Sequence, residues 1–476
     1  MKDDEIAHTT SCIAEVKRVF AEDEEVSGRL LADLLTDLGQ VLTYRQEDAL
    51  DHLAVNPNLK KDIPYIIART PNEKTNTKGA SWFNLYLRVY RGIILLARNL
   101  VVHHFRIDLD EVSSSFDKYI ANVRSDIPVI SKTIAAYLQL FANASQTLGE
   151  SAKCIRFRNS VINNSTTRNI IRSDIEARLA LFVLIRNTID KEDTLDYDSV
   201  EYLVLEGAKI DFSTDLNGSD TILLLTLGDC ITHERFLTWI HQHVERKAKL
   251  PNLFRLLQVV ITSREDWSNH DIICLLSWLY RYFEIVSDDC HRLLTSSDGD
   301  KDELATAHSS MMSLLDSLTH LGKFETCQKY LRSYRGIENI IQLLRTIHEN
   351  TERQTLKNKD HHSQNKSSKS FPEAKSLLIE LLSYLVYESF ESQEKVREQH
   401  GLELVLSNCV IDKNEPYIKE RAIICIRFLL EKNAENQKFV AQLEAKKTYD
   451  EEALREVGYE TEIIDGKLKL KKVDNT

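Results

Sequence analysis

Apolar side chains recur along most of the chain with the spacing of amphipathic helices, and short polar breaks separate these segments. Two of the most apolar segments are LLIELLSYLVY, at residues 377–387, and RAIICIRFLLE, at residues 421–431. A helix that is apolar around most of its circumference must be covered by neighbours. The pattern therefore predicts an all-α fold in which helices pack against one another.

The polar segments that follow these two helices repeat each other. FESQEKVREQHGLE (390–403) aligns without gaps with AENQKFVAQLEAKK (434–447), and Glu391 falls on Glu435, 44 residues later. A unit of this size, built of two or three helices, is typical of armadillo and HEAT repeats. Such a unit cannot cover its own apolar face, so we expect an armadillo-like or HEAT-like helical superhelix whose repeats share one core.

Weaker echoes of the same period occur upstream. Asn99, Asn143 and Asn187 end similar apolar fragments at intervals of 44 residues. An Asn amide offers both an acceptor and a donor, so a row of them could hold the backbone of an extended peptide. The alternative is that each Asn caps the C-terminus of a helix. Gly336 and Gly401 each join two helices and are predicted to adopt a left-handed turn.

Breaks in this pattern divide the chain. Residues 1–350 are predicted to form irregular armadillo-like repeats, and residues 374–447 to form further repeats at the C-terminal end. Residues 351–373 between them contain few apolar side chains, so we expect a mobile polar loop. Residues 448–476 form a tail in which apolar and charged residues alternate around Asp465-Gly466, which predicts a small β-hairpin. A disordered tail is the alternative.

Composition favours helices and narrows the classes of function. Only 14 Gly and 7 Pro occur among 476 residues, fewer than folds with many tight turns need. The formal net charge is −12, so we expect no binding to nucleic acid. Arg88, Arg91 and Arg98 interrupt the best membrane candidate, and the first residues do not resemble a signal peptide. We therefore expect a soluble, cytoplasmic protein without membrane insertion.

No motif supplies catalytic chemistry. His233-Glu234 begins like a zinc-protease motif, but position 237, where the second His would fall, is Leu237. The sequence contains no P-loop, no G-x-S-x-G and no dinucleotide fingerprint. We predict that the protein is not an enzyme and needs no cofactor.

The densest group of possible metal ligands consists of Cys230, His233, His241 and His243. His241 and His243 are two residues apart, so they would point to different sides of a helix. Surface histidines and one buried thiol are therefore favoured over a zinc site. The eight cysteines show neither a disulfide framework nor a C-x-x-C motif.

The C-terminal residues are similar to a known family. ESFESQEKVREQHGLELVLSNCVIDKNEPYIKERAIICIRFLLEKNAENQKFVAQLE resembles the C-terminal domain of the ataxin-10 family, including its cysteine before Ile-Asp, its Asn-x-Pro and its Arg before Leu-Leu-Glu. The tail VGYETEIIDGKLKLKK is also similar to the family's ending. The resemblance covers residues 374–472.

This resemblance implies an armadillo-like protein without enzymatic activity that acts through protein contacts. It also implies self-association, a role in cytokinesis, and partners among signalling or cell-division proteins. Fungal relatives carry a copper-transport label, so metal homeostasis, direct or indirect, is the alternative function. Cuprous copper prefers thiolate and thioether ligands, yet the chain has 3 Met and no C-x-x-C, so direct copper transport is not supported.

The C-terminal repeats contain candidate contact residues. Arg421 stands where the family commonly has Trp, and Tyr384 and Phe428 stand where armadillo repeats place an Asn nine residues before the Gln. These aromatic residues favour close packing or an apolar contact with a partner. The predicted protein-binding residues are Asn99, Asn143, Asn187, Tyr384, Tyr417, Arg421 and Phe428.

Overall fold

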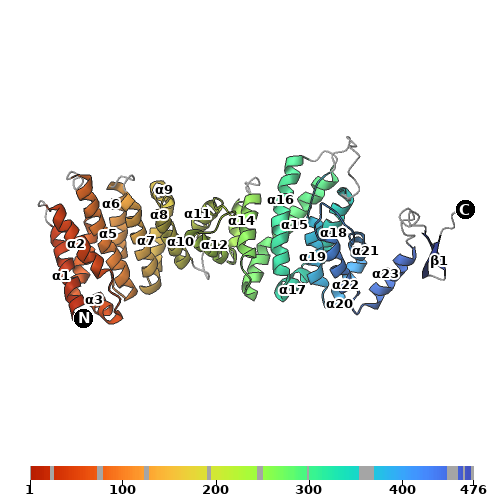
Figure 1. The fold of residues 1–476 in the computed structure, drawn as a ribbon, viewed down its shortest axis with the longest axis horizontal. Coiled ribbons are helices and arrows are strands. Elements are labelled where there is room, and N and C mark those ends of the chain that lie inside the picture. Colours follow the sequence, from red (N-terminus) through yellow and green to blue (C-terminus); the bar gives the residue numbers. More distant parts are fainter. Residues whose placement is uncertain are drawn as a thin grey trace. The chain divides into compact units, whose positions relative to one another are not determined.

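The structure is a computed structural model that describes residues 2–21, 26–71, 79–122, 128–189, 195–243, 250–296, 300–352, 369–446, 459–464 and 467–472. The chain forms two compact units, Met1–Trp239 and Ile240–Thr476. Each unit is a stack of helices whose successive members lie side by side (Figure 1).

Short loops separate the helices of the first unit. Asn56, Asp174 and Asn217 precede three of them and accept hydrogen bonds from first-turn backbone N–H groups, which favours helix initiation there. In chain order the helices are α1 (Lys2–Ala21), α2 (Gly28–Val41), α3 (Glu47–Val55), α4 (Pro57–Ala68), α5 (Ala80–Val102), α6 (Leu109–Asn122), α7 (Pro128–Thr147), α8 (Ser151–Asn163), α9 (Ser165–Arg172), α10 (Ile175–Thr188), α11 (Tyr197–Gly207), α12 (Gly218–Ile231) and α13 (Phe236–His243), which contains the unit boundary.

One row of helices forms the centre of this unit. In the row α2, α5, α7, α10 and α12, each helix packs against the next. The interval of 44 residues between Asn99, Asn143 and Asn187 corresponds to one step along this row, from α5 to α7 to α10. None of the described helices is both long and apolar enough to cross a membrane.

Hydrogen bonds join neighbouring helices of the row at the same interval. Nδ2 of Asn143 donates to the backbone oxygen of Arg98 at 3.1 Å. One repeat later, Nδ2 of Asn187 donates to the backbone oxygen of Ala142 at 3.0 Å. A polar contact that recurs at this position fixes how far one repeat can slide along the next, because a shift would leave half-buried polar groups unpaired.

The second unit contains a similar row. Its helices are α14 (Leu250–Thr262), α15 (Asn269–Thr295), α16 (Lys301–Gly322), α17 (Glu325–Ser333), α18 (Gly336–Asn350), α19 (Ala374–Val386), α20 (Phe390–Glu398), α21 (Gly401–Ser407), α22 (Ile418–Leu430) and α23 (Ala434–Lys446). Helices α14, α16, α19 and α22 each pack against the next. The segments 377–387 and 421–431 thus lie in adjacent, equivalent helices, as the sequence repeat predicted.

Three helices make up each of the last complete repeats. The short α17 leads into α18 and α19, and the short α20 leads into α21 and α22. Helix α23 follows α22 and contacts both α22 and α20. Repeats of two or three helices that share a core are the organisation of armadillo and HEAT proteins, so the predicted all-α fold class is confirmed.

The junctions after α17 and α20 differ from the prediction that their glycines adopt a left-handed conformation. The left-handed residues are Arg335 (φ 61°) and His400 (φ 55°), not the glycines that follow them. Gly336 and Gly401 are instead the first residues of α18 and α21. A Cβ on Gly401 would lie only 2.8 Å from Cδ1 of Ile341. The same Cβ would lie 3.1 Å from the backbone oxygen of Val396, so glycine serves close packing here rather than an unusual backbone conformation.

The tail contains the expected pair of strands. β1 (Tyr459–Ile464) and β2 (Lys467–Lys472) pair antiparallel, with Tyr459 opposite Lys472 and Ile464 opposite Lys467. The predicted turn residues, Asp465 and Gly466, lie outside the described residues.

Most of the predicted mobile loop, 353–368 of 351–373, also lies outside the described residues. Its C-terminal end is attached to the stack. Nζ of Lys369 donates to the backbone oxygen of Leu293 at 2.8 Å and of Leu294 at 2.6 Å, and Phe371 is buried. The predicted divisions 1–350, 374–447 and 448–476 stay predictions.

The glycine contacts lead to a prediction about stability. Gly401→Ala should lower the free energy of unfolding by about 1–3 kcal/mol, because the new methyl group would overpack the contact with Ile341 and Val396. Gly39→Ala in α2 is the control: a Cβ there meets nothing within 4 Å, so the helix should gain up to about 1 kcal/mol. Urea unfolding followed by circular dichroism measures both. Equal effects of the two substitutions would contradict the packing role of Gly401.

Candidate protein-binding face

A buried network of charged groups positions α22. Asp412 and Glu415, in the segment between α21 and α22, are both buried. Nζ of Lys375, at the start of α19, lies 3.3 Å from Oδ2 of Asp412. The Glu415 carboxyl accepts hydrogen bonds from the backbone N–H groups of Lys375 at 3.3 Å and Ser376 at 3.0 Å, which a helix start leaves without a partner. The network therefore fastens the residues before α22 to the start of α19.

Burial raises the pKa of Glu415 to about 7, although the charge of Lys375 and the backbone N–H groups act in the opposite direction. The folded protein then keeps a proton that the unfolded chain releases above its ordinary pKa of 4.5. Because the folded state binds more protons in this range, stability falls as the pH rises from about 4.5 to about 7 and levels off above it.

Two pairs of side chains join α22 to α19 and to the residue that follows it. Nη2 of Arg421 lies 2.8 Å from Oε2 of Glu380. The rings of Phe428 and Tyr387 meet edge to face, with centroids 4.8 Å apart. Arg421 and Phe428 are seven residues apart in α22, so they lie on one side of it, and Tyr387 is the residue that directly follows α19. Together with the residues between them, they define the α19–α22 face: Glu380, Tyr384, Tyr387, Arg421, Ile424 and Phe428.

The middle of this face is apolar and open to solvent. Ile424 is 49% exposed. Tyr387 is 45% exposed. Tyr384 is half-buried because it packs on α16, where a Cβ added to Gly322 would lie 2.9 Å from its Cδ2. Burial raises the pKa of the Tyr384 phenol above its usual value.

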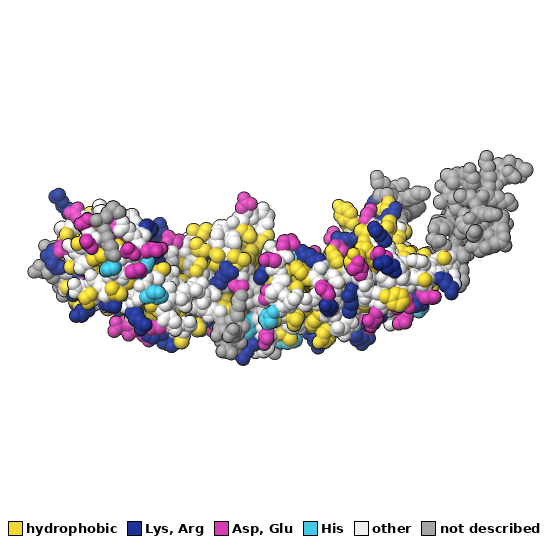
Figure 2. Space-filling model, turned by 90° about the horizontal axis from the view of Figure 1, so that it is seen from below, with side chains coloured by type: hydrophobic (Ala, Val, Ile, Leu, Met, Phe, Trp, Pro, Cys, Tyr) yellow, Lys and Arg dark blue, Asp and Glu magenta, His cyan; other side chains and the backbone are white. Residues whose placement is uncertain are grey.

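Charge contributes little to this face. Figure 2 shows Lys and Arg alternating with Asp and Glu on the side of the molecule that it presents, with apolar side chains between them. On the α19–α22 face itself, the Arg421–Glu380 pair leaves no net charge. Exposed apolar residues beside aromatic rings and an Arg are typical of protein contact sites.

The structure thus brings together three of the predicted binding residues, Tyr384, Arg421 and Phe428. Tyr417 lies beside them, just before α22, with a left-handed backbone (φ 62°) and a side chain that is 72% exposed. The expectation that Tyr384 and Phe428 pack closely agrees with their half-buried side chains. Their role in binding stays a prediction.

The three predicted Asn residues belong to the first unit and follow one another along α5, α7 and α10. All three are half-buried. Asn143 and Asn187 donate to the preceding helix, and Oδ1 of Asn99 accepts from Nη2 of Arg98 at 2.8 Å. Each Asn therefore has a role inside the stack, and its part in holding a peptide stays a prediction.

Sequence reasoning did not single out Tyr387, Ile423 or Ile424. A signal was present, because segment 421–431 is apolar on all sides although it lies in the last repeat of the alignment. An apolar helix near the end of a stack lacks one neighbour, and the side toward that missing neighbour is exposed.

The cysteines are poorly suited to bind metal. Metal ions bind the thiolate, and burial disfavours this form. Burial raises the pKa to about 12 for five thiols: Cys12, Cys154, Cys290, Cys327 and Cys425.

The structure describes three of the four possible metal ligands named above, and they do not form a cluster. In the described part of the chain, no three or more His, Cys, Asp or Glu side chains come together to hold a metal ion. Cys230 and His233 are buried in the first unit, and His241 belongs to the second. Nδ1 of His241 lies 3.3 Å from the hydroxyl of Tyr282. The side chain of His243 lies outside the described residues.

The buried carboxyl gives a testable dependence on pH. Glu415→Gln replaces the protonated acid by a neutral group of the same shape, so the variant should lose the decline in stability between about pH 4.5 and pH 7. Relative to the natural chain, the variant should become more stable by up to about 3 kcal/mol as the pH rises through this range. Urea unfolding at pH 5, 6, 7 and 8 measures the difference. A variant that loses stability relative to the natural chain as the pH rises would show that the carboxylate is the favoured form.

Comparison with known proteins places these features in a family. Residues 374–471 match the family model described as the spinocerebellar ataxia type 10 protein domain. The ataxin-10 homolog of Debaryomyces hansenii is 38% identical over 450 residues, which cover 93% of this chain and 92% of that protein. The ataxin-10 homolog of Candida albicans is 31% identical over 445 residues, covering 87% and 89%. Human ataxin-10 is 32% identical over 234 residues, covering 47% and 48%.

Among solved structures, an engineered protein aligns with 87% of this chain and 98% of its own at 10% identity and a TM-score of 0.31. Importin beta aligns with 90% of this chain and 63% of its own at 10% identity and a TM-score of 0.25. The fold assignment rests on the helix packing described above and not on these two structures. The similarity to the D. hansenii protein extends over nearly the whole sequence, and the chain therefore belongs to the ataxin-10 family.

Proposed function

We propose that this protein is a non-catalytic, cytoplasmic scaffold that binds other proteins, and that the α19–α22 face is one of its binding surfaces. The observation that carries the proposal is the exposure of Ile424, which lies on the same side of α22 as Arg421 and Phe428, beside the Tyr387–Phe428 ring pair. Apolar side chains on a helix of a repeat stack are normally covered by the next repeat. A partner that covers them would remove apolar surface from water, the main driving force of association.

The chemistry of the face suits a partner with an apolar patch of its own. The Arg421–Glu380 pair lies beside the apolar centre, where it could fix the orientation of the partner through hydrogen bonds. A second copy of the chain is one such partner, because the face carries both an Arg and a Glu and could complement itself about a two-fold axis. Self-association is also what membership of the ataxin-10 family implies.

The cellular role follows from the family rather than from the geometry. We place the partners among signalling or cell-division proteins, with a role in the regulation of cytokinesis. The alternative role, copper homeostasis through direct binding, is disfavoured by the raised pKa of the buried thiols.

The proposal predicts that charge in the middle of the face abolishes partner binding. The substitution Ile424→Glu should reduce proximity labelling of the principal partner in cells about tenfold or more, because burying a carboxylate against an apolar surface is costly. Sedimentation velocity of the purified variant measures the effect on self-association. Deletion of residues 374–476 should have the same effect on labelling.

The matched control is Ile273→Glu, on α15 of the same unit, where the natural side chain is 51% exposed. This variant should label its partners and associate like the natural chain. Equal losses in Ile273→Glu and Ile424→Glu, or unchanged labelling by Ile424→Glu, would refute the placement of the surface.

A separate measurement addresses the copper alternative. We expect the purified chain, loaded with cuprous or zinc ions and then dialysed, to retain far less than one metal ion per molecule, because burial raises the pKa of five of its thiols, among them Cys154 and Cys327, and so disfavours the thiolate that binds metal. Elemental analysis provides the count. One ion of copper or zinc retained per chain would overturn this ranking of functions.

A further inference from the structure

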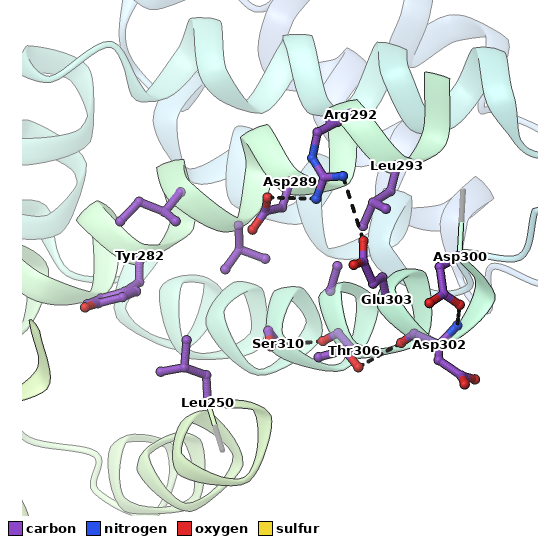
Figure 3. A pocket seen from close by; sticks show the side chains of 13 residues that line it. Leu250, Tyr282, Asp289, Arg292, Leu293, Asp300, Asp302, Glu303, Thr306 and Ser310 are labelled. Atoms are coloured by element: carbon purple, nitrogen blue, oxygen red, sulfur yellow. Dashed lines mark hydrogen bonds and ion pairs between the residues drawn. The ribbon is translucent and has the colours of Figure 1, made fainter. Parts of the chain in front are cut away.

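A groove of about 340 Å³ lies in the second unit between α15 and the first half of α16. Tyr282, Val286 and Leu293 form its wall on α15, at helical spacing, and Ala307 faces them from α16. Leu250, the first residue of α14, lines one end (Figure 3). The groove is at the small end of the roughly 300–1,000 Å³ range of ligand sites, a size that suits one or two large side chains.

The rim of the groove is acidic. Asp289 on α15 and Asp300, Asp302 and Glu303 at the start of α16 all line it. Among the described lining residues, Arg292 carries the only positive charge. The carboxylates at the start of α16 also favour that helix, but Asp289 lies within α15, where it has no such effect. The rim therefore carries more negative charge than the helix start explains.

Arg292 shows how a cation is held at this rim. Its Nη2 lies 3.2 Å from Oδ1 of Asp289, and its Nη1 lies 3.8 Å from Oε2 of Glu303 on the opposite helix. Figure 3 shows the guanidinium between these two carboxylates. The Arg292 side chain is 61% exposed, so each pair contributes little to stability and can exchange with another cation at small cost.

We propose that this groove binds a segment of a partner protein in which a large apolar side chain is flanked by Lys or Arg. The apolar side chain would lie against Tyr282 and Val286, and the flanking cations would reach Asp289 and Glu303, displacing Arg292 from one of them. Charge complementarity selects this partner over nucleic acid or an acidic peptide, since the rim repels anions. The groove is separate from the α19–α22 face, and the two surfaces can be tested independently.

The test uses the full chain and a fluorescein-labelled decapeptide with two central leucines flanked on both sides by lysines. Fluorescence anisotropy should detect binding that weakens as salt is raised from about 50 mM to about 500 mM.

The double variant Asp289→Asn with Glu303→Gln should weaken binding about tenfold. Arg292→Ala should tighten binding about threefold, because it frees both carboxylates. Ile285→Ala, which trims the apolar lining, should weaken binding without changing its salt dependence.

Two controls separate the groove from general attraction to a chain of net charge −12. The double variant Glu284→Gln with Asp288→Asn removes the same charge from a different groove of α15 and should bind like the natural chain. The peptide with glutamate in place of lysine should not bind. Thermal unfolding checks that each variant is folded. Equal weakening by the two double variants, no tightening by Arg292→Ala, or no binding of the lysine peptide would overturn the proposal.

Discussion

The apolar face that each repeat leaves uncovered is the constraint on which the rest of this structure depends. Helices α5, α7, α10 and α12 in the first unit, and α16, α19 and α22 in the second, each cover the preceding helix of their row. Each added repeat brings an apolar face of its own, so the last repeat of any stack needs a different kind of cover. Helix α23 covers part of α22, yet Ile423 and Ile424 stay about half exposed. The candidate binding face thus arises from the same physical cause as the core.

Polar groups between the repeats have a different role. They fix the position of one helix along its neighbour, whereas the apolar contacts supply the attraction between the helices. The Asn143 and Asn187 amides each reach one repeat back to a backbone oxygen, and the Lys375–Asp412 and Glu415 contacts fasten the start of α19 to the residues before α22. Removing one partner of such a contact would leave a shielded polar group unpaired, which costs more than the bond itself contributes. Register in turn decides which side chains meet at the surface. The pairing of Arg421 with Glu380 and of Phe428 with Tyr387 exists only because α22 is held at one height beside α19.

The helical architecture could be predicted from the sequence because it depends on local periodicity and on the repeat of 44 residues, and segments 377–387 and 421–431 do lie in adjacent helices. The role of Gly401 could not, because the contact with Ile341 joins residues that are 60 positions apart, and the left-handed conformation falls on His400 instead. Among the site residues, Tyr384, Arg421 and Phe428 were found as departures from a family pattern. Ile424 was not, because its exposure depends on which elements pack against α22 and not on the sequence of α22 itself.

The two surfaces of the second unit differ in the force that would hold a partner. The α19–α22 face is apolar with a balanced ion pair, so binding there would depend on buried area and would change little with salt. The groove between α15 and α16 has excess negative charge around a small apolar wall, so binding there would depend on cations and would weaken as salt screens them. Segments suited to one surface would be poor ligands for the other, since a basic segment gains nothing from a neutral face and a purely apolar one gains nothing from the acidic rim. If both proposed surfaces bind, one chain would hold two different partners without competition between them, a property that suits a scaffold and that a single extended groove would not provide.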